Sequence, residues 1–215
     1  MFNVLEGNLP YLLKGAVMTL WLSVAVVGLG TLLGIAMGIL ATTRSRFARA
    51  FVTGYIFVLR GIPVLVVMFL GYYAFPAFGL HVNAYVAVGL AQIAYLGAFV
   101  AEITRSAILS IPASQIAAAR SLGMRRPAIL RQVILPQAAR IAIAPLLNSA
   151  LTAIKQTSYA SVVGVWELTY AAREVVERTL AAFQIFLGVM VIYFLICYPL
   201  SLAARWSESR LSFSH

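Results

Sequence analysis

The chain has 215 residues, of which 62% are hydrophobic and only 10% are charged, and its formal net charge is +10. Average soluble domains carry about 25% charged residues, so this composition excludes an ordinary soluble domain. Strongly basic proteins often bind nucleic acid, but such proteins are rarely this apolar. The excess of cations therefore indicates orientation in a membrane.

Five stretches are expected to cross a bilayer as helices, each of which needs about 20 mostly apolar residues. Three runs, 15–43, 61–101 and 179–204, contain no Asp, Glu, Lys or Arg, and a turn signal at 76–79 divides the middle one. The first run is longer than the roughly 7–15 residues of a signal-peptide core, so it is a permanent span. A further helix reaches spanning length if Lys155 is accepted inside it. The expected spans are about 15–42, 51–75, 83–105, 139–163 and 181–204.

These spans predict an all-α, polytopic membrane protein with one transmembrane domain over residues 1–215. Eleven of the sixteen basic residues fall in or beside the first and third links between spans, or after the fifth span. Because basic loops stay in the cytoplasm, we expect the N-terminus outside and the C-terminus inside. The eleven are Arg44, Arg46, Arg49, Arg105, Arg120, Arg125, Arg126, Arg131, Arg140, Arg205 and Arg210.

Several kinds of chemistry are missing from the sequence. There is one cysteine, Cys197, and the two histidines have too few acids nearby for a metal site. No Gly-x-x-x-x-Gly-Lys-Ser/Thr or His-Glu-x-x-His run occurs, so the chain is not expected to hydrolyse ATP or to hold a metal or cofactor itself. Glycines at 28, 30, 34 and 38 fall within the first span, where small residues let helices approach closely.

The link between the third and fourth spans, about 110–136, is expected to form a short helix-turn-helix on the cytoplasmic face. Ser114 is expected to cap the first helix after Pro112, and the alanines that follow favour helix. Gly123 is a stop signal, and the Arg-Arg-Pro run at 125–127 starts the second helix. The alternative is a solvated loop whose arginines only anchor the orientation.

The same link resembles the "EAA" loop of ABC-importer permeases, through Ala118-Ala119-x-x-Leu122-Gly123 and, twelve residues on, Leu135-Pro136-x-Ala138. Other runs are similar to motifs of the permeases of polar-amino-acid importers, the histidine, glutamine and opine group. The resemblance covers about residues 10–210. These runs are Arg60-Gly61-Ile62-Pro63, Glu102-x-x-Arg105, Ser110-Ile111-Pro112, Lys155-Gln156-Thr157-Ser158, Gly164-Val165-x-Glu167-Leu168 and Arg178-Thr179.

The resemblance implies a permease subunit of a type I ABC importer in the bacterial inner membrane, moving a polar amino acid by alternating access. It implies separate ATP-binding subunits that carry ATP and Mg, a second permease that is identical or homologous, and a soluble binding protein that touches about 167–178. The loop would dock the ATP-binding subunit through Ser114, Ala117, Ala118, Arg120, Leu122, Gly123 and Arg125.

The chain departs from the family pattern at several positions. The loop glutamate of the family falls on Ala117 and its tryptophan on Ile116, so docking must use other groups such as Arg120. The residue after the pocket lysine is often Asp in the family but is Gln156 here, which removes a fixed negative charge and argues against a pocket strictly selective for arginine or lysine. A tyrosine three positions before Glu102 is replaced by Phe99.

Three ionisable residues within spans are the candidate substrate ligands, because an ionisable group there costs roughly 2.5–3.5 kcal/mol and tends to face a cavity. Lys155, followed by the polar run 156–158, is expected to line the pathway. Arg60 either contacts substrate or makes a structural contact. Glu102 either contacts substrate or pairs with Arg105.

For a zwitterionic amino acid, Lys155 is expected to contact the carboxylate, while Glu102 or backbone carbonyls receive the ammonium. The remaining expected contacts are Arg60, Phe99, Gln92, Gln156, Thr157 and Ser158. The alternatives are an importer of another small polar solute, a membrane-embedded enzyme that uses Glu102 and Lys155 as acid and base, and a scaffold subunit without a pathway.

Overall fold

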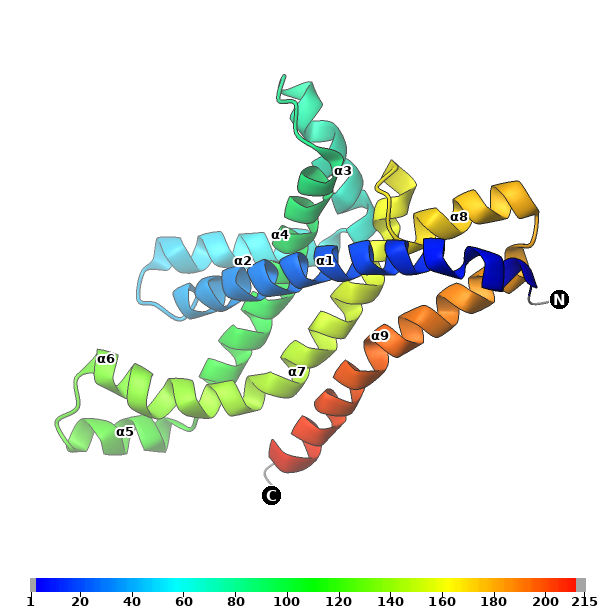
Figure 1. Cartoon of the computed structure of the whole chain (residues 1–215). Helices are drawn as coiled ribbons and strands as arrows, with labels where there is room; N and C mark the ends of the chain where they lie inside the picture. The colour runs from blue at the N-terminus through cyan, green and yellow to red at the C-terminus, as the bar shows by residue number, and fades with distance from the viewer. Residues whose placement is uncertain (1–2, 212–215) are drawn as a thin grey trace.

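A computed structural model describes residues 3–211, and throughout this part of the chain the regular structure is helical, which confirms the expected all-α class. The ends of the expected domain, residues 1–2 and 212–215, lie outside the described residues. Figure 1 shows the N-terminus and α8 at one end of the molecule and α5 with α6 at the other. The elements are α1 (Asn3–Leu40), α2 (Arg46–Gly61), α3 (Val64–Ala77), α4 (Ala84–Leu109), α5 (Ala113–Ser121), α6 (Arg126–Ile129), the π-helix η1 (Leu130–Ile134), α7 (Leu135–Gln156), the 3-10 helix η2 (Thr157–Val163), α8 (Leu168–Thr179) and α9 (Ala182–Leu211).

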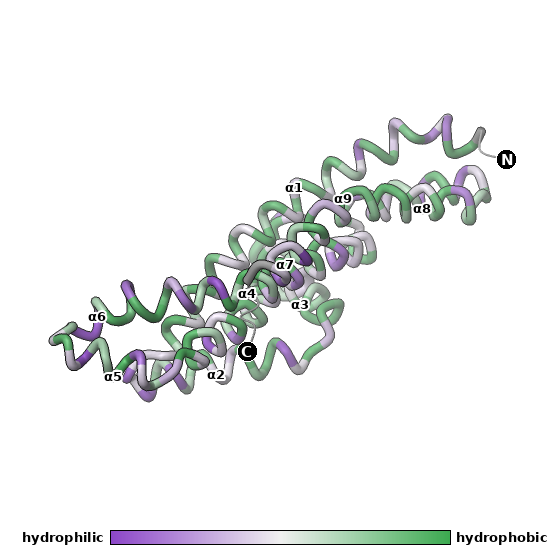
Figure 2. Tube along the Cα trace, turned by 90° about the horizontal axis from the view of Figure 1, so that it is seen from below, coloured by the Kyte–Doolittle hydropathy of each residue, from purple (hydrophilic) through white to green (hydrophobic). Residues whose placement is uncertain are grey.

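Within residues 3–211, four helical stretches are long and apolar enough to cross a membrane: Val4–Leu40, Ala84–Leu109, Arg126–Val163 and Ala182–Ser209. A fifth span exists only if the bent pair of α2 and α3 is counted as one. In Figure 2, the hydropathy colouring places many hydrophilic residues along α5 and α6 and near the N-terminal end of the molecule. The structure therefore agrees with four or five spans.

The expected span over about 51–75 is formed by two helices, α2 and α3, with a bend between them. The chain turns by 107° between α2 and α3. Pro63 has no N–H to donate to the preceding turn, and it restricts Ile62 to an extended conformation, φ −108° and ψ 136°. The helix must therefore end at Gly61 and restart after the proline.

A seam of glycines joins α1 to α4. A Cβ added at Gly34 would lie 2.4 Å from Cβ of Val100 and 2.7 Å from the carbonyl oxygen of Gly97, and one added at Gly38 would lie 2.5 Å from Cβ of Thr104. Such spacing lets two backbones approach where no side chain fits between them. The expected close-packing role of these glycines is confirmed for Gly30, Gly34 and Gly38, whereas Gly28 faces open space.

The first helix begins at Asn3, twelve residues before the expected start of the first span. Its early turns pack against α8 and α9, where Leu12, Leu168 and Ile185 are fully buried. A Cβ at Gly15 would lie 3.0 Å from Cα of Leu168. Contact with α8, which hydropathy does not reveal, therefore extends the helix past the apolar run.

The link over 110–136 forms the expected helix-turn-helix of α5 and α6, but the expected cap at Ser114 is wrong. Pro112 occupies the N-cap position, so Ser114 lies inside the first turn and its side chain makes no cap hydrogen bond. The stop at Gly123 is confirmed, with φ +73°. The N–H groups of Gly123 and Met124 donate to the carbonyls of Arg120 and Ala119, the pattern of a Schellman motif.

The fourth expected span is helical to Val163 and ends at Gly164, which has φ +81°. The helical stretch that contains it begins at Arg126 and passes through the π-helix η1, where the N–H of Leu135 reaches back five residues to the carbonyl of Leu130. Pro136 follows at once and cannot donate a hydrogen bond to the preceding turn, which favours this local widening. The break between α7 and η2 falls directly after Lys155 and Gln156.

Candidate functional sites

A cavity of about 220 Å³ lies between α4 and α7, and we call it the α4–α7 cavity. Two of the expected substrate contacts, Phe99 and Gln156, line it together. Its α4 wall is aromatic and apolar, whereas its α7 wall carries amides and hydroxyls. The cavity is lined by Tyr95, Leu96, Phe99, Asn148, Ser149, Thr152 and Gln156.

Arg60 stands at the edge of this cavity. Its guanidinium carbon lies 5.3 Å from the centre of the Phe99 ring, a cation–π contact, and its side chain is exposed. Arg60 is the last basic residue of α2, next to the break at Pro63. The bend between α2 and α3 therefore presents a cation beside the ring that lines the cavity.

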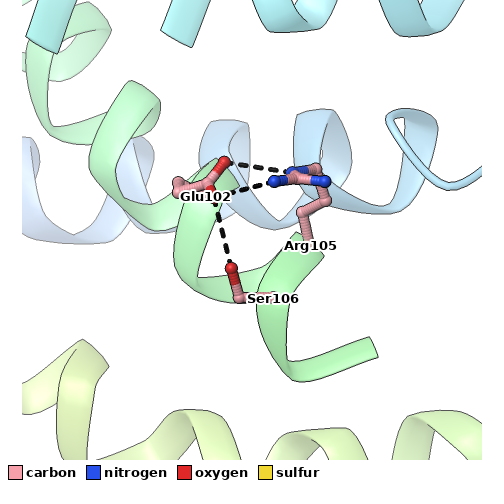
Figure 3. Close-up of polar contacts among 3 residues, drawn as sticks. All are labelled: Glu102, Arg105 and Ser106. Carbon is pink, nitrogen blue, oxygen red and sulfur yellow. Dashed lines mark hydrogen bonds and ion pairs between the residues drawn. The ribbon is translucent and has the colours of Figure 1, made fainter. Parts of the chain in front are cut away.

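Glu102 is paired with Arg105, as Figure 3 shows. Arg105 donates from Nε and from Nη2 to the two carboxylate oxygens at 3.0 and 2.9 Å, and the Ser106 hydroxyl donates to Oε1 at 3.2 Å. Both carboxylate oxygens of Glu102 therefore accept hydrogen bonds from residues one turn further along α4. Of the two interpretations of Glu102, the pair with Arg105 is the one present in the structure.

Lys155 lies on another face of α7. It lines a separate cavity of about 380 Å³ between α7 and α9, the α7–α9 cavity, with Arg205 at the other end and no acidic side chain in the lining. Consecutive helical residues point about 100° apart, and here Gln156 lines the α4–α7 cavity while Lys155 lines the α7–α9 cavity. The structure does not bring Lys155 together with Glu102, Arg60 or Phe99. The α7–α9 cavity is lined by Leu151, Lys155, Met190, Tyr193, Phe194, Cys197, Tyr198, Ser201 and Arg205.

The side chains of the other expected substrate contacts donate hydrogen bonds to backbone carbonyls of the helices. The hydroxyls of Thr157 and Ser158 donate to the carbonyls of Ile154 and Lys155 at 2.7 and 2.8 Å. Gln92 is fully buried and donates from Nε2 to the carbonyl of Ala153 at 2.9 Å. These side chains stabilise the end of α7 and its contact with α4.

Five lining residues of the α4–α7 cavity were not expected from the sequence: Tyr95, Leu96, Asn148, Ser149 and Thr152. A usable signal was present. Asn148, Thr152 and Gln156 are spaced four residues apart in α7, so they form one polar stripe on a single face.

The helix-turn-helix exposes the residues expected to contact an ATP-binding subunit. Ser114, Ala117, Ala118, Arg120, Gly123 and Arg125 are all exposed, and Leu122 at the tip is 82% exposed. The hairpin is held to the start of α7 by a hydrogen bond from Gln137 Nε2 to Gln115 Oε1. An apolar tip flanked by arginines on a short, braced hairpin is suited to contact another protein.

Several apolar helices, a polar cavity between two of them and a braced hairpin at one end define the class of membrane transport subunits. The sequence matches the family model described as "Binding-protein-dependent transport system inner membrane component" over residues 30–213. The chain belongs to this family. Its members are transport components rather than enzymes, so the expectation of a transport subunit is confirmed and a membrane-embedded enzyme is excluded.

Curated relatives support the same family along almost the whole chain. The glutamine transport system permease protein GlnP of Escherichia coli (strain K12) is 37% identical over 205 residues, which is 94% of each chain. The probable glutamine ABC transporter permease protein GlnM of Bacillus subtilis (strain 168) is 32% identical over 213 residues, which is 99% of each chain. The L-cystine transport system permease protein TcyB of the same strain is 35% identical over 203 residues, covering 94% of this chain and 87% of the relative.

Solved structures share the fold. The crystal structure of an amino acid ABC transporter with histidines superposes with a TM-score of 0.91, 30% identity and 98% coverage of each chain. An inward-facing MetNI methionine ABC transporter, at 20% identity, has a TM-score of 0.76 over 97% of this chain and 99% of that one, which shows the fold alone. The chain is thus a type I ABC importer permease, whose family works with ATP-binding subunits and a substrate-binding protein.

Proposed function

We propose that this permease imports a polar amino acid across the bacterial inner membrane. The observation that carries the proposal is the α4–α7 cavity, where a guanidinium, two aromatic rings and a row of amides and hydroxyls meet. Relatives named for glutamine and cystine transport support the same substrate class. Import of another small polar solute is the alternative.

The substrate would bind in the α4–α7 cavity. Arg60 would hold the carboxylate, because a guanidinium presents paired donors that match a carboxylate. The amide oxygens of Gln156 and Asn148 would receive the ammonium or a side-chain amide. Phe99 and Tyr95 would pack against the apolar part of the substrate. Lys155 is not in this set, since it lines the α7–α9 cavity.

Transport would proceed by alternating access between two permeases, identical or homologous, with the N-terminus outside and the C-terminus in the cytoplasm. Basic residues of the α1–α2 link and of the α5–α6 hairpin support this orientation. ATP and Mg would bind to the partner ATP-binding subunits at the hairpin. A loaded binding protein would deliver substrate at the opposite end, on α8.

Uptake into proteoliposomes that contain the whole transporter tests the substrate class. Labelled glutamine should enter only with ATP inside and loaded binding protein outside, and polar amino acids should compete more strongly than sugars or inorganic ions. Competition by a non-amino-acid solute alone would favour the alternative importer. Purification of the permease without an ATP-binding subunit would contradict the assembly.

The hairpin's role is tested by the pair Gly123→Glu and Gly79→Glu. Both glycines have φ +73° and open space around them, so both substitutions impose a similar backbone strain of about 1–2 kcal/mol. Only Gly123 lies on the hairpin, so Gly123→Glu should abolish most of the ATPase stimulation by loaded binding protein, while Gly79→Glu retains it. Equal stimulation in both variants would count against docking at the hairpin.

A further inference from the structure

A buried carboxylate ties three helices together at the α8 end of the molecule. Glu167 is fully buried and caps the start of α8, where its Oε1 accepts from the N–H of Tyr170 at 2.9 Å. Its Oε2 accepts from the hydroxyls of Thr19 in α1 and Tyr193 in α9, both at 3.1 Å. Burial raises the pKa of Glu167, opposed by these hydrogen bonds and by the N–H of Thr169.

The neighbouring contacts strengthen this tie. The Thr19 hydroxyl also accepts from the N–H of Leu168 at 3.1 Å, and Thr169 lies 3.3 Å from the Tyr193 hydroxyl. The Tyr193 hydroxyl oxygen therefore contacts both Glu167, the N-cap of α8, and Thr169 in the first turn of α8. The ring of Tyr193 lines the α7–α9 cavity beside Lys155.

A second tie holds α8 but does not reach α9. The hydroxyl of Tyr11 and the indole N–H of Trp166 both donate to Oε2 of Glu174, and Arg178 lies 5.4 Å from the centre of the Tyr11 ring. This tie joins α8 only to α1 and to the turn before α8. Of the two ties, the one at Glu167 connects α8 to α9.

We propose that the Glu167–Tyr193 hydrogen bond is a positioning link through which a protein docked on α8 acts on α9. Arg173, Glu177 and Arg178 of α8 are exposed to a partner, while the N-terminal end of α8, at Glu167 and Thr169, contacts the Tyr193 hydroxyl. A displacement of α8 would therefore be passed to α9 and to the cavity between α9 and α7. The inference rests on the proposed docking of a binding protein at α8.

The experiment compares two Tyr→Phe substitutions in the reconstituted transporter. Tyr193→Phe keeps the ring and the apolar packing of α8 on α9 but removes the hydroxyl that contacts Glu167 and Thr169, and Tyr11→Phe removes a hydroxyl from the tie that stops at α1. We measure the ratio of ATPase activity with and without amino-acid-loaded binding protein, and the binding-protein concentration at half-maximal stimulation. Thr169→Ala, which removes the second contact to the same hydroxyl, provides a further reading if Tyr193→Phe does not assemble.

The link predicts that Tyr193→Phe lowers the stimulation ratio by up to about tenfold, the loss expected for one hydrogen bond. Basal ATPase and the half-saturating concentration should stay at the wild-type level, and Tyr11→Phe should keep the full ratio. An unchanged ratio in Tyr193→Phe, an equal fall in both variants, or a change in the half-saturating concentration alone would overturn the link. If the wild-type transporter is not stimulated at all, the proposed function fails and the link with it.

Discussion

The two cavities that flank α7 differ in wall and charge, although one helix supplies residues to both. The α4–α7 cavity combines aromatic rings with neutral amides and hydroxyls and has one cation, Arg60, at its edge. The α7–α9 cavity contains two cations, Lys155 and Arg205, and no acidic side chain in its lining. A zwitterionic solute needs a cation for its carboxylate and acceptors for its ammonium. The first cavity offers amide and hydroxyl oxygens as acceptors, whereas the second offers only hydroxyls beside its two cations.

The difference shows that neighbours in sequence are not neighbours in a site. The polar run 155–158 reads as one hydrophilic patch, yet Lys155 faces α9, Gln156 faces α4, and the hydroxyls of Thr157 and Ser158 bond to the preceding turn. Each residue is turned by about 100° from the last. Lys155 and Gln156 therefore line different cavities although they are adjacent in the sequence.

The largest expected effect comes from a substitution in α1 that displaces α4 and with it the α4 wall of the α4–α7 cavity. Gly34→Val places side-chain atoms where Cβ of Val100 and the backbone oxygen of Gly97 already lie, and the backbone cannot move aside. We expect a cost of at least about 3 kcal/mol and little assembled permease. Gly28→Val is the matched control, since Gly28 is in the same helix with nothing within 4 Å. Membrane levels and gel-filtration profiles check this, and equal yields of both variants would contradict the seam.

The next effect tests the cation of the α4–α7 cavity. Arg60→Gln removes the charge over Phe99 and should raise the KM for uptake by tenfold to about a hundredfold, because a charge-assisted hydrogen bond is worth about 1.5–3 kcal/mol. Arg49→Gln, an exposed arginine of the same helix, serves as the control and should leave KM unchanged. Proteoliposome uptake measures both. A wild-type KM in Arg60→Gln would place the carboxylate elsewhere.

A smaller effect concerns the selectivity of the α4–α7 cavity between amino acids. Gln156→Asp adds a negative charge to the α4–α7 cavity and should improve competition by arginine relative to glutamine by about tenfold, equivalent to about 1.4 kcal/mol. Gln132→Asp, exposed on η1, introduces the same charge away from the cavity. Competition uptake with both amino acids gives the ratio. A shift of the same size in the control would show that the charge acts at long range.

Much of the fold could be predicted from the sequence, because hydropathy and turn residues report local preferences directly. The stop at Gly123 and the helix to Val163 follow from such signals. The break at Pro63 was also present in the sequence as Gly-Ile-Pro, but the apolar run across it concealed the 107° turn. The early start of α1 depends on α8, some 150 residues away, and no local pattern contains that contact.

The site was predictable only in part for a similar reason. Phe99, Gln156 and Arg60 were among the expected contacts, but their grouping around one cavity requires knowing which face of α7 meets α4. The pairing of Glu102 with Arg105 was one of two open interpretations, and it follows from the i, i+3 spacing on one helix. The separation of Lys155 from these residues depends on where α9 packs, which the apolar run of α9 does not specify.

Equilibrium binding to the assembled transporter tests the central claim, that the α4–α7 cavity holds the substrate. The probe is the labelled amino acid that competes best in uptake, and the variants are Gln156→Leu and Lys155→Met, adjacent residues that line different cavities. We predict that Gln156→Leu weakens binding about tenfold or more, as loss of a polar contact requires. Lys155→Met should bind within about twofold of the wild type. Loss of binding in Lys155→Met with normal binding in Gln156→Leu would contradict the account.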